Sequence, residues 1–140
     1  MFNPSRDEAR RFLAGAWRKY RAGQPLTGLE QTAAGIIAMH PEYHALLDDL
    51  ESSLDRDWAP EAGAANPFLH LSLHLAVAEQ LAIDQPPGIV GQYRRLCAAR
   101  PDEHAALHVV IDCLGEVLWQ AQRQRAAPDG EAYLACLRRH

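Results

Sequence analysis

Residues 66–83 read NPFLHLSLHLAVAEQLAI and form the most apolar stretch of the chain. Asparagine followed by proline is a strong helix start, because the asparagine side chain caps the helix and proline suits its first position. Apolar side chains then surround nearly the whole helix axis, which is typical of a buried helix. Because two histidines and a glutamate interrupt the stretch, it predicts a central core helix and not a membrane span.

The predicted core helix has two apolar faces, and we expect both to be buried. The first face carries Phe68, Leu71, Leu75, Ala78 and Ala82, and the second carries Leu69, Leu73 and Ala76. A helix that is apolar on more than one side needs neighbours on more than one side, so the other helices are expected to surround it.

Three helices are predicted before this stretch. The capping boxes SRDE at residues 5–8 and TGLE at residues 27–30 begin the first and the second, and the second is expected to end near residue 38. Pro41 disfavours helical geometry at the residue before it and suits the first turn of a third helix, which we expect to reach about residue 54. Residues 56–65 are expected to form a loop.

Three further helices are predicted after the core helix. The sequence QPPG at residues 85–88 ends the core helix, and a helix over about residues 88–99 follows. A long helix is expected from Arg100-Pro101 to about residue 125, and Pro128-Asp129-Gly130 separates it from a short last helix. Because strand periodicity is absent, we predict an all-α fold: a single-domain bundle of five to seven helices over residues 1–140.

The composition is that of a globular protein of about one domain, with 140 residues of which 48% are hydrophobic and 23% charged. Charge is uneven: residues 1–21 have a net charge of +4 and residues 22–90 a net charge of −9. We therefore expect the basic first helix either to pack against the acidic middle of its own chain or to be solvated. Nucleic-acid binding is not expected, because no recognition motif accompanies the basic residues.

The cysteines and the first residues indicate the compartment. Cys97, Cys113 and Cys136 are an odd number without CxxC spacing, so we expect neither a disulfide framework nor a zinc knuckle. Cys113 is expected to be a thiol in the core. The first residues become polar at once and lack the apolar stretch of a signal peptide. A cytoplasmic protein without a membrane partner is therefore expected, while a homo-oligomer and a protein partner stay open.

Several stretches carry a resemblance to a known family. They are FNPSR near the start, HPEYH at residues 40–44, NPFLHLSLH at 66–74, EQLAIDQPPGI at 79–89 and CLGEVLWQAQR at 113–123. With them the chain resembles the short bacterial proteins of domain of unknown function 1841 along nearly its whole length. The resemblance implies a small helical bacterial protein and brings no activity, cofactor or site residue with it.

Six of the seven histidines form three HxxxH pairs, at residues 40/44, 70/74 and 104/108. Residues four apart lie on one helix face, so each pair can direct two imidazoles at one ion. Because imidazole suits zinc, iron, copper and nickel, we predict a transition-metal site between helices, with zinc or iron as the metal. The candidate ligands are His44, His70, His74, His104, His108 and Glu116.

The chemistry of such a site stays open. An open coordination position would permit metal-assisted hydrolysis or redox chemistry, but the sequence names no substrate, and it leaves undecided whether the protein is an enzyme. It contains neither an HExxH nor an ExxH motif, which argues against a zinc peptidase and a di-iron bundle. The alternative is a non-catalytic interaction protein whose histidines form a buried polar network, for example His108 donating to Asp112.

Overall fold

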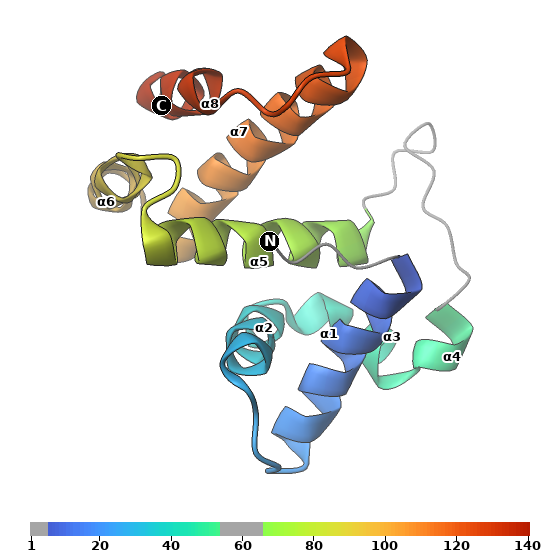
Figure 1. Ribbon diagram of the computed structural model, residues 1–140. Coiled ribbons are helices and arrows are strands. Elements are labelled where there is room, and N and C mark those ends of the chain that lie inside the picture. Colours follow the sequence, from blue (N-terminus) through green and yellow to red (C-terminus); the bar gives the residue numbers. More distant parts are fainter. Residues whose placement is uncertain (1–5, 54–65) are drawn as a thin grey trace. The chain divides into compact units, whose positions relative to one another are not determined.

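The computed structural model describes residues 6–53 and 66–140, and Figure 1 traces its helices along the chain. Six helices in this part of the chain have nine residues or more, and it contains no strand. They are α1 (Arg6–Arg21), α2 (Gly28–Ala38), α5 (Pro67–Ile83), α6 (Ile89–Ala99), α7 (Glu103–Gln124) and α8 (Gly130–Arg138). The predicted all-α class is confirmed. The capping role of Ser5 and the loop over residues 56–65 lie outside the described residues.

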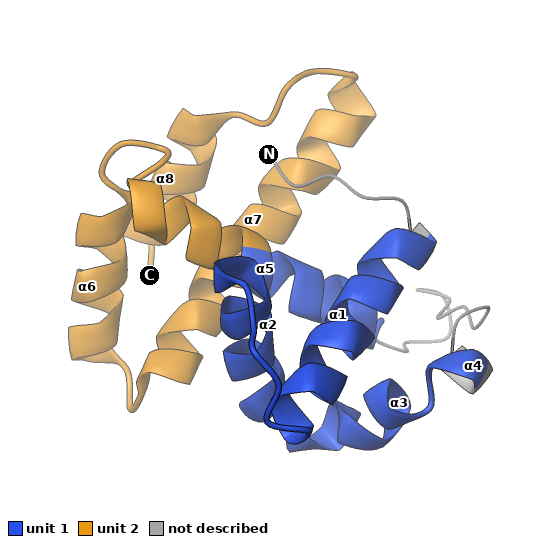
Figure 2. Ribbon diagram, turned by 60° about the horizontal axis from the view of Figure 1, so that its bottom comes forward, with its two compact units in different colours: residues 1–75 blue, residues 76–140 orange. Residues whose placement is uncertain are grey.

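The chain divides into two compact units, residues 1–75 and 76–140, which Figure 2 colours separately. The division falls within α5, so the first half of this helix belongs to the first unit and the second half to the second. The prediction that residues 1–140 form a single domain stays a prediction, and the two units are described in turn.

In the first unit, α2 begins and ends where the sequence predicts. Thr27 Oγ1 accepts the backbone N–H of Glu30 at 3.2 Å, and Glu30 Oε1 accepts the backbone N–H of Thr27 at 2.9 Å. This reciprocal capping box satisfies two N–H groups that the first turn of a helix leaves without a partner. The helix ends at Ala38, before Pro41, as expected.

Ion pairs join α1 to the acidic residues that follow it in the chain. Lys19 Nζ lies 2.8 Å from Glu30 Oε2, and Arg21 Nη1 lies 2.9 Å from Asp48 Oδ2. The lysine and the N–H of Thr27 hold the pKa of Glu30 below its usual range. The expectation that the basic first helix pairs with acidic residues of its own chain is confirmed.

The predicted third helix from Pro41 to about residue 54 is wrong, because this segment is broken. It consists of the 3-10 turn η1 (Pro41–Tyr43), α3 (His44–Asp48) and α4 (Leu50–Ser53). Asp49 has φ −121° and ψ 74°, which is not helical. Asp48 and Asp49 lie at the C-terminal end of α3, where a negative charge is unfavourable because this end of the helix dipole is itself negative. Asp48 also forms an ion pair with Arg21 of α1. Both features favour the end of the helix at this point.

Helix α5 starts as predicted, because Asn66 Oδ1 accepts the backbone N–H groups of Phe68 at 3.0 Å and Leu69 at 3.2 Å. Phe68, Leu71 and Leu75 are buried, which confirms most of the first apolar face. The expected burial is wrong at Leu69, which is 56% exposed, and at Ala82, which is also exposed. Ile83, next to Ala82, is 68% exposed. Neither end of the helix is covered on every side.

In the second unit, an aspartate side chain accepts backbone N–H groups at the start of each of α6, α7 and α8. The Asp84 carboxylate accepts the N–H groups of Gly88 at 3.2 Å and Val90 at 3.0 Å, at the start of α6. Gly88 has φ 100°, a left-handed conformation that glycine adopts without strain. Asp102 caps α7 by accepting the N–H of Ala105 at 2.7 Å, and Asp129 caps α8. Helix α7 thus starts three residues after the predicted Arg100.

Helices α7 and α8 are joined by a disulfide between Cys113 and Cys136. The expectation that Cys113 is a free core thiol is therefore wrong, although the residue is buried as predicted. The reason is tertiary: the packing of α8 on α7 brings the two Cα atoms to 5.8 Å from each other across 23 residues of sequence. This distance suits a disulfide.

No helix in the part of the chain that the structure describes combines the length and the hydrophobicity that a crossing of the bilayer requires.

Burial along α5 predicts the effect of two matched substitutions. Leu71 is 0% exposed and Leu69 is 56% exposed, two residues apart on the same helix. We expect Leu71→Ala to lower the free energy of unfolding by about 2–5 kcal/mol, because it removes buried methyl groups and leaves a cavity. Leu69→Ala should change it by no more than about 0.5 kcal/mol. Urea denaturation of both variants checks this, and equal losses would contradict the burial of Leu71.

The pair of Glu30 and Lys19 predicts a pH dependence. Because the pKa of Glu30 is lowered in the folded chain, its carboxylate contributes stability above the ordinary glutamate pKa and loses it as the pH falls through the folded value. The stability difference between the wild type and Glu30→Gln should therefore shrink from pH 6 to pH 3. Denaturation curves at both pH values measure it. A constant difference would mean that the pair has no effect on folding.

Candidate metal centre

The end of α2 orients two imidazole rings through backbone carbonyl groups. His40 Nδ1 lies 2.8 Å from the oxygen of Ile36, and His44 Nε2 lies 2.8 Å from the oxygen of Ile37. Because a carbonyl oxygen only accepts, each of these ring nitrogens carries the hydrogen. In the neutral form of each ring, the lone pair is then on Nε2 of His40 and on Nδ1 of His44. His40 is 2% exposed.

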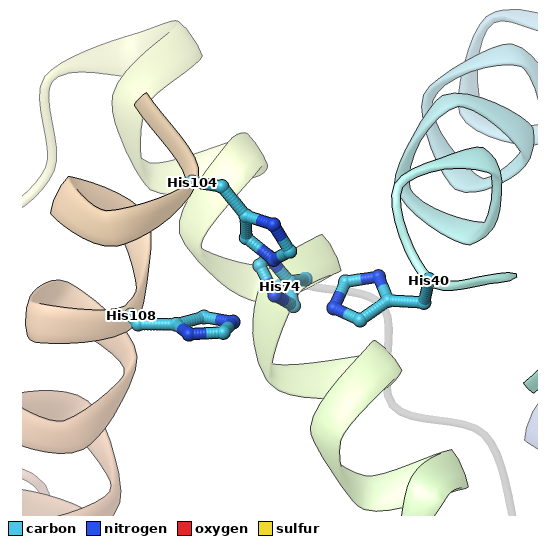
Figure 3. Close-up of side chains that lie close together, drawn as sticks. All are labelled: His40, His74, His104 and His108. Carbon is cyan, nitrogen blue, oxygen red and sulfur yellow. The ribbon is translucent and has the colours of Figure 1, made fainter. Parts of the chain in front are cut away.

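Three imidazoles gather in the first unit. The ring centroids of His40 and His74 are 4.7 Å apart, those of His40 and His70 are 5.0 Å apart, and those of His70 and His74 are 4.8 Å apart. One ring nitrogen of His40 lies within 4.8 Å of one of His74. Figure 3 shows these two rings directed toward each other, one from the turn after α2 and one from α5.

Tyr43 covers one side of this group. Its ring stacks on the His40 ring with centroids 5.4 Å apart and planes 4° from parallel. Burial, with a smaller effect of Glu42, raises the pKa of the Tyr43 phenol above its ordinary value. The phenol is therefore neutral near pH 7, and Tyr43 covers the His40 ring as an uncharged side chain rather than as an anionic ligand.

The second unit provides its own pair of imidazoles on α7. His104 and His108 are four residues apart, and their ring centroids are separated by 4.3 Å. One nitrogen of each ring lies within 4.8 Å of the other, and both residues are half-buried. Figure 3 shows both side chains leaving the same face of α7. This pair has the geometry that its HxxxH spacing predicts.

Two predicted ligands lie apart from these groups. His44 uses Nε2 on the Ile37 carbonyl, and its ring packs 4.3 Å from that of Trp17. Glu116 is eight residues beyond His108 on α7, which is about 12 Å along the helix axis. It is exposed and lines a cavity of about 340 Å³ between α7 and α8.

His40 is the candidate ligand that the sequence prediction did not include. The sequence placed it at a helix cap and paired it with His44, and neither feature indicates that its ring turns toward α5. The available signal was chemical: two histidines directly after a helix end, beside a proline, are well placed to donate to the last carbonyl groups of that helix.

The arrangement fits the coordination chemistry of a first-row metal. Zinc binds imidazole nitrogen at about 2.0–2.1 Å, so two nitrogens on one tetrahedral ion are about 3.4 Å apart. The two nitrogens of each pair lie within 4.8 Å of each other, so binding one ion would require the rings to move closer together. In protein sites a metal-binding histidine usually donates its other ring N–H to a carbonyl or carboxylate, as His40 does to Ile36.

Comparisons with known proteins place the chain in a family. A search of curated proteins and a search of solved structures found no match. The family described as Domain of unknown function (DUF1841) matches residues 5–139 of the 140 residues. The resemblance that the sequence motifs indicate is thereby confirmed, and the chain belongs to the DUF1841 family.

Proposed function

We propose that this protein binds a transition-metal ion through histidines of its first unit, with His40, His70 and His74 as the ligands. The observation that carries the proposal is the hydrogen bond from His40 Nδ1 to the Ile36 carbonyl. It fixes the tautomer with the lone pair on Nε2, which prepares this nitrogen to bind a metal before any ion arrives.

The proposed ligands all belong to the first unit, where the three ring centroids lie 4.7–5.0 Å from one another. His104 and His108 form a separate candidate pair in the second unit. Zinc is the first candidate metal because neutral imidazole nitrogen is one of its usual ligands, and iron is the second.

An ion that binds only the folded chain would stabilise the fold. The proposal is therefore a metal-binding protein, without a reaction attached to it.

One observation favours the alternative, an interaction protein whose histidines form a polar network without a metal. The Ile36 and Ile37 carbonyls accept ring N–H groups from His40 and His44, which stabilises the buried end of α2 by hydrogen bonds alone. The cytoplasmic location expected from the cysteines stays a proposal as well.

Metal-dependent stabilisation is the first test. We expect zinc or iron(II) to raise the melting temperature of protein purified without a histidine tag at pH 7.5. A metal at a hundred times its dissociation constant would add about 2.7 kcal/mol if it binds only the folded chain. Imidazole binds metal only when neutral and has an ordinary pKa of about 6.5, so the shift should be lost at pH 5.5. Melting curves with zinc, iron(II), nickel and copper measure it.

A metal-free preparation whose melting temperature no metal raises would overturn the proposal. Elemental analysis of the purified protein decides whether it was metal-free. The polar-network alternative would then stand, because a network is complete without a metal.

Substitutions test the proposed ligands. His40→Ala with His74→Ala should abolish the metal-dependent shift, since this change leaves one of the three imidazoles. His44→Ala is the matched control, because it removes a neighbouring histidine bound to Ile37 and should keep the shift. Circular dichroism verifies that every variant is helical. A shift that survives the loss of His40 and His74 would mean that these two histidines are not the ligands.

A further inference from the structure

The second unit holds a separate group of metal-binding side chains where α7 and α8 pack together. One ligand atom from each of Cys113, Cys136 and His140 lies within 4.8 Å of the other two. Glu116 adds a carboxylate, with Oε2 3.8 Å from the Cys136 sulfur. None of these residues belongs to the proposed histidine centre, so the two sites stand or fall independently.

Spacing along both helices brings these side chains to one place. Cys113 and Glu116 are three residues apart on α7, and Cys136 and His140 are four residues apart at the end of α8. Each pair therefore lies on one helix face. The N–H of His140 donates to the Leu137 carbonyl at 3.1 Å, which continues the helical turn up to His140. The cysteine Cα atoms are 5.8 Å apart, so the two faces meet.

The ligand types are those of zinc. Thiolate, imidazole and carboxylate are its usual protein ligands, and thiolates select soft metals over magnesium or calcium. The cavity of about 340 Å³ is lined by Glu116, Cys136 and Arg139, which gives an ion a route from solvent to the sulfur. The Arg139 cation offsets the excess negative charge that two thiolates and a carboxylate would leave on a divalent ion.

In the structure the two sulfurs are bonded to each other. A metal ligand is the thiolate, so the bond and the metal exclude each other. We propose that Cys113, Cys136, His140 and Glu116 form a zinc site in the reduced protein, and that formation of the disulfide releases the ion.

Reduction of the disulfide requires a dithiol as the electron donor, and its formation requires a peroxide as the electron acceptor. A dithiol transfers two electrons and two protons to the S–S bond, which gives two cysteine thiols and a cyclic disulfide. Zinc then displaces the two thiol protons. In the opposite direction, hydrogen peroxide accepts two electrons from the thiolates and two protons from solvent. This step forms the S–S bond and two water molecules, and it frees the zinc.

Cobalt(II), which reports sulfur ligands through charge-transfer absorption, tests the site. The full chain carrying His40→Ala and His74→Ala, which lacks the histidine centre, is reduced with a phosphine and titrated with cobalt. We expect about one cobalt per chain with sulfur-to-cobalt absorption in the near ultraviolet, its displacement by zinc, and its loss on addition of peroxide. The oxidised chain should show no such absorption. Imidazole alone does not produce it, so the two proposed sites cannot be confused.

Variants assign the ligands. Cys136→Ser should abolish the sulfur absorption, while Glu116→Gln and His140→Ala should each weaken zinc binding by about tenfold or more, measured by competition with a chelator. Glu116 and His140 are exposed, so these two variants keep the fold even if Cys136→Ser does not. Cys97→Ser is the matched control, because Cys97 is a free cysteine on α6 outside the group, and it should leave binding unchanged.

Three results would overturn the proposal. The first is a folded chain whose disulfide resists reduction, since the switch requires a bond that opens. The second is a reduced chain with both thiols titratable and no sulfur absorption with cobalt. The third is zinc affinity that is unchanged in both Glu116→Gln and His140→Ala, which would leave the cysteines without the proposed partners.

Discussion

The carbonyl groups at the end of α2 impose the constraint on which the histidine centre depends. A helix ends with carbonyl oxygens that no further turn can satisfy, and their dipoles make that end negative. Here Ile36 and Ile37 each accept one backbone N–H, from Met39 and His40. Each also accepts an imidazole N–H. Because Pro41 prevents the helix from continuing, these ring donors replace the missing turn.

The same constraint separates two histidines that look alike in sequence. His40 donates from Nδ1 to the Ile36 carbonyl, which leaves Nε2 for coordination. His44 donates from Nε2 to the Ile37 carbonyl, and its ring packs on Trp17. Their HxxxH spacing therefore does not act as a pair, since the segment between them is a 3-10 turn and not a continuous helix. His104 and His108 share one uninterrupted helix and keep the geometry that the spacing implies.

The sequence predicted what depends on local rules and missed what depends on packing at a distance. Capping by Thr27 and Asn66 is set within a few residues, so the starts of α2 and α5 followed from the sequence. Whether Leu69 is covered depends on which neighbours reach it, and hydrophobicity alone does not say. The disulfide joins Cys113 to Cys136, which lies 23 residues further along the chain, so local sequence rules do not reveal it. Imidazole as the ligand type, which the histidine pairs predict, stays a prediction. The direction of the His40 ring is set by the backbone carbonyl of Ile36, which the spacing of the histidines does not indicate.

The two proposed sites differ in their ligand atoms, which are imidazole nitrogens in the first and include two thiolate sulfurs in the second. The first site is therefore sensitive to acid and the second to oxidants. Imidazole does not undergo thiol oxidation, so a centre of histidines would keep its ion under oxidants and lose it on acidification. Thiolates lose two electrons readily, so the site of Cys113 and Cys136 would lose its ion to a peroxide at constant pH. Protons would therefore act on one site through its nitrogens, and oxidants would act on the other through its sulfurs. A single small helical chain would in this way respond to two separate chemical signals through its metal content.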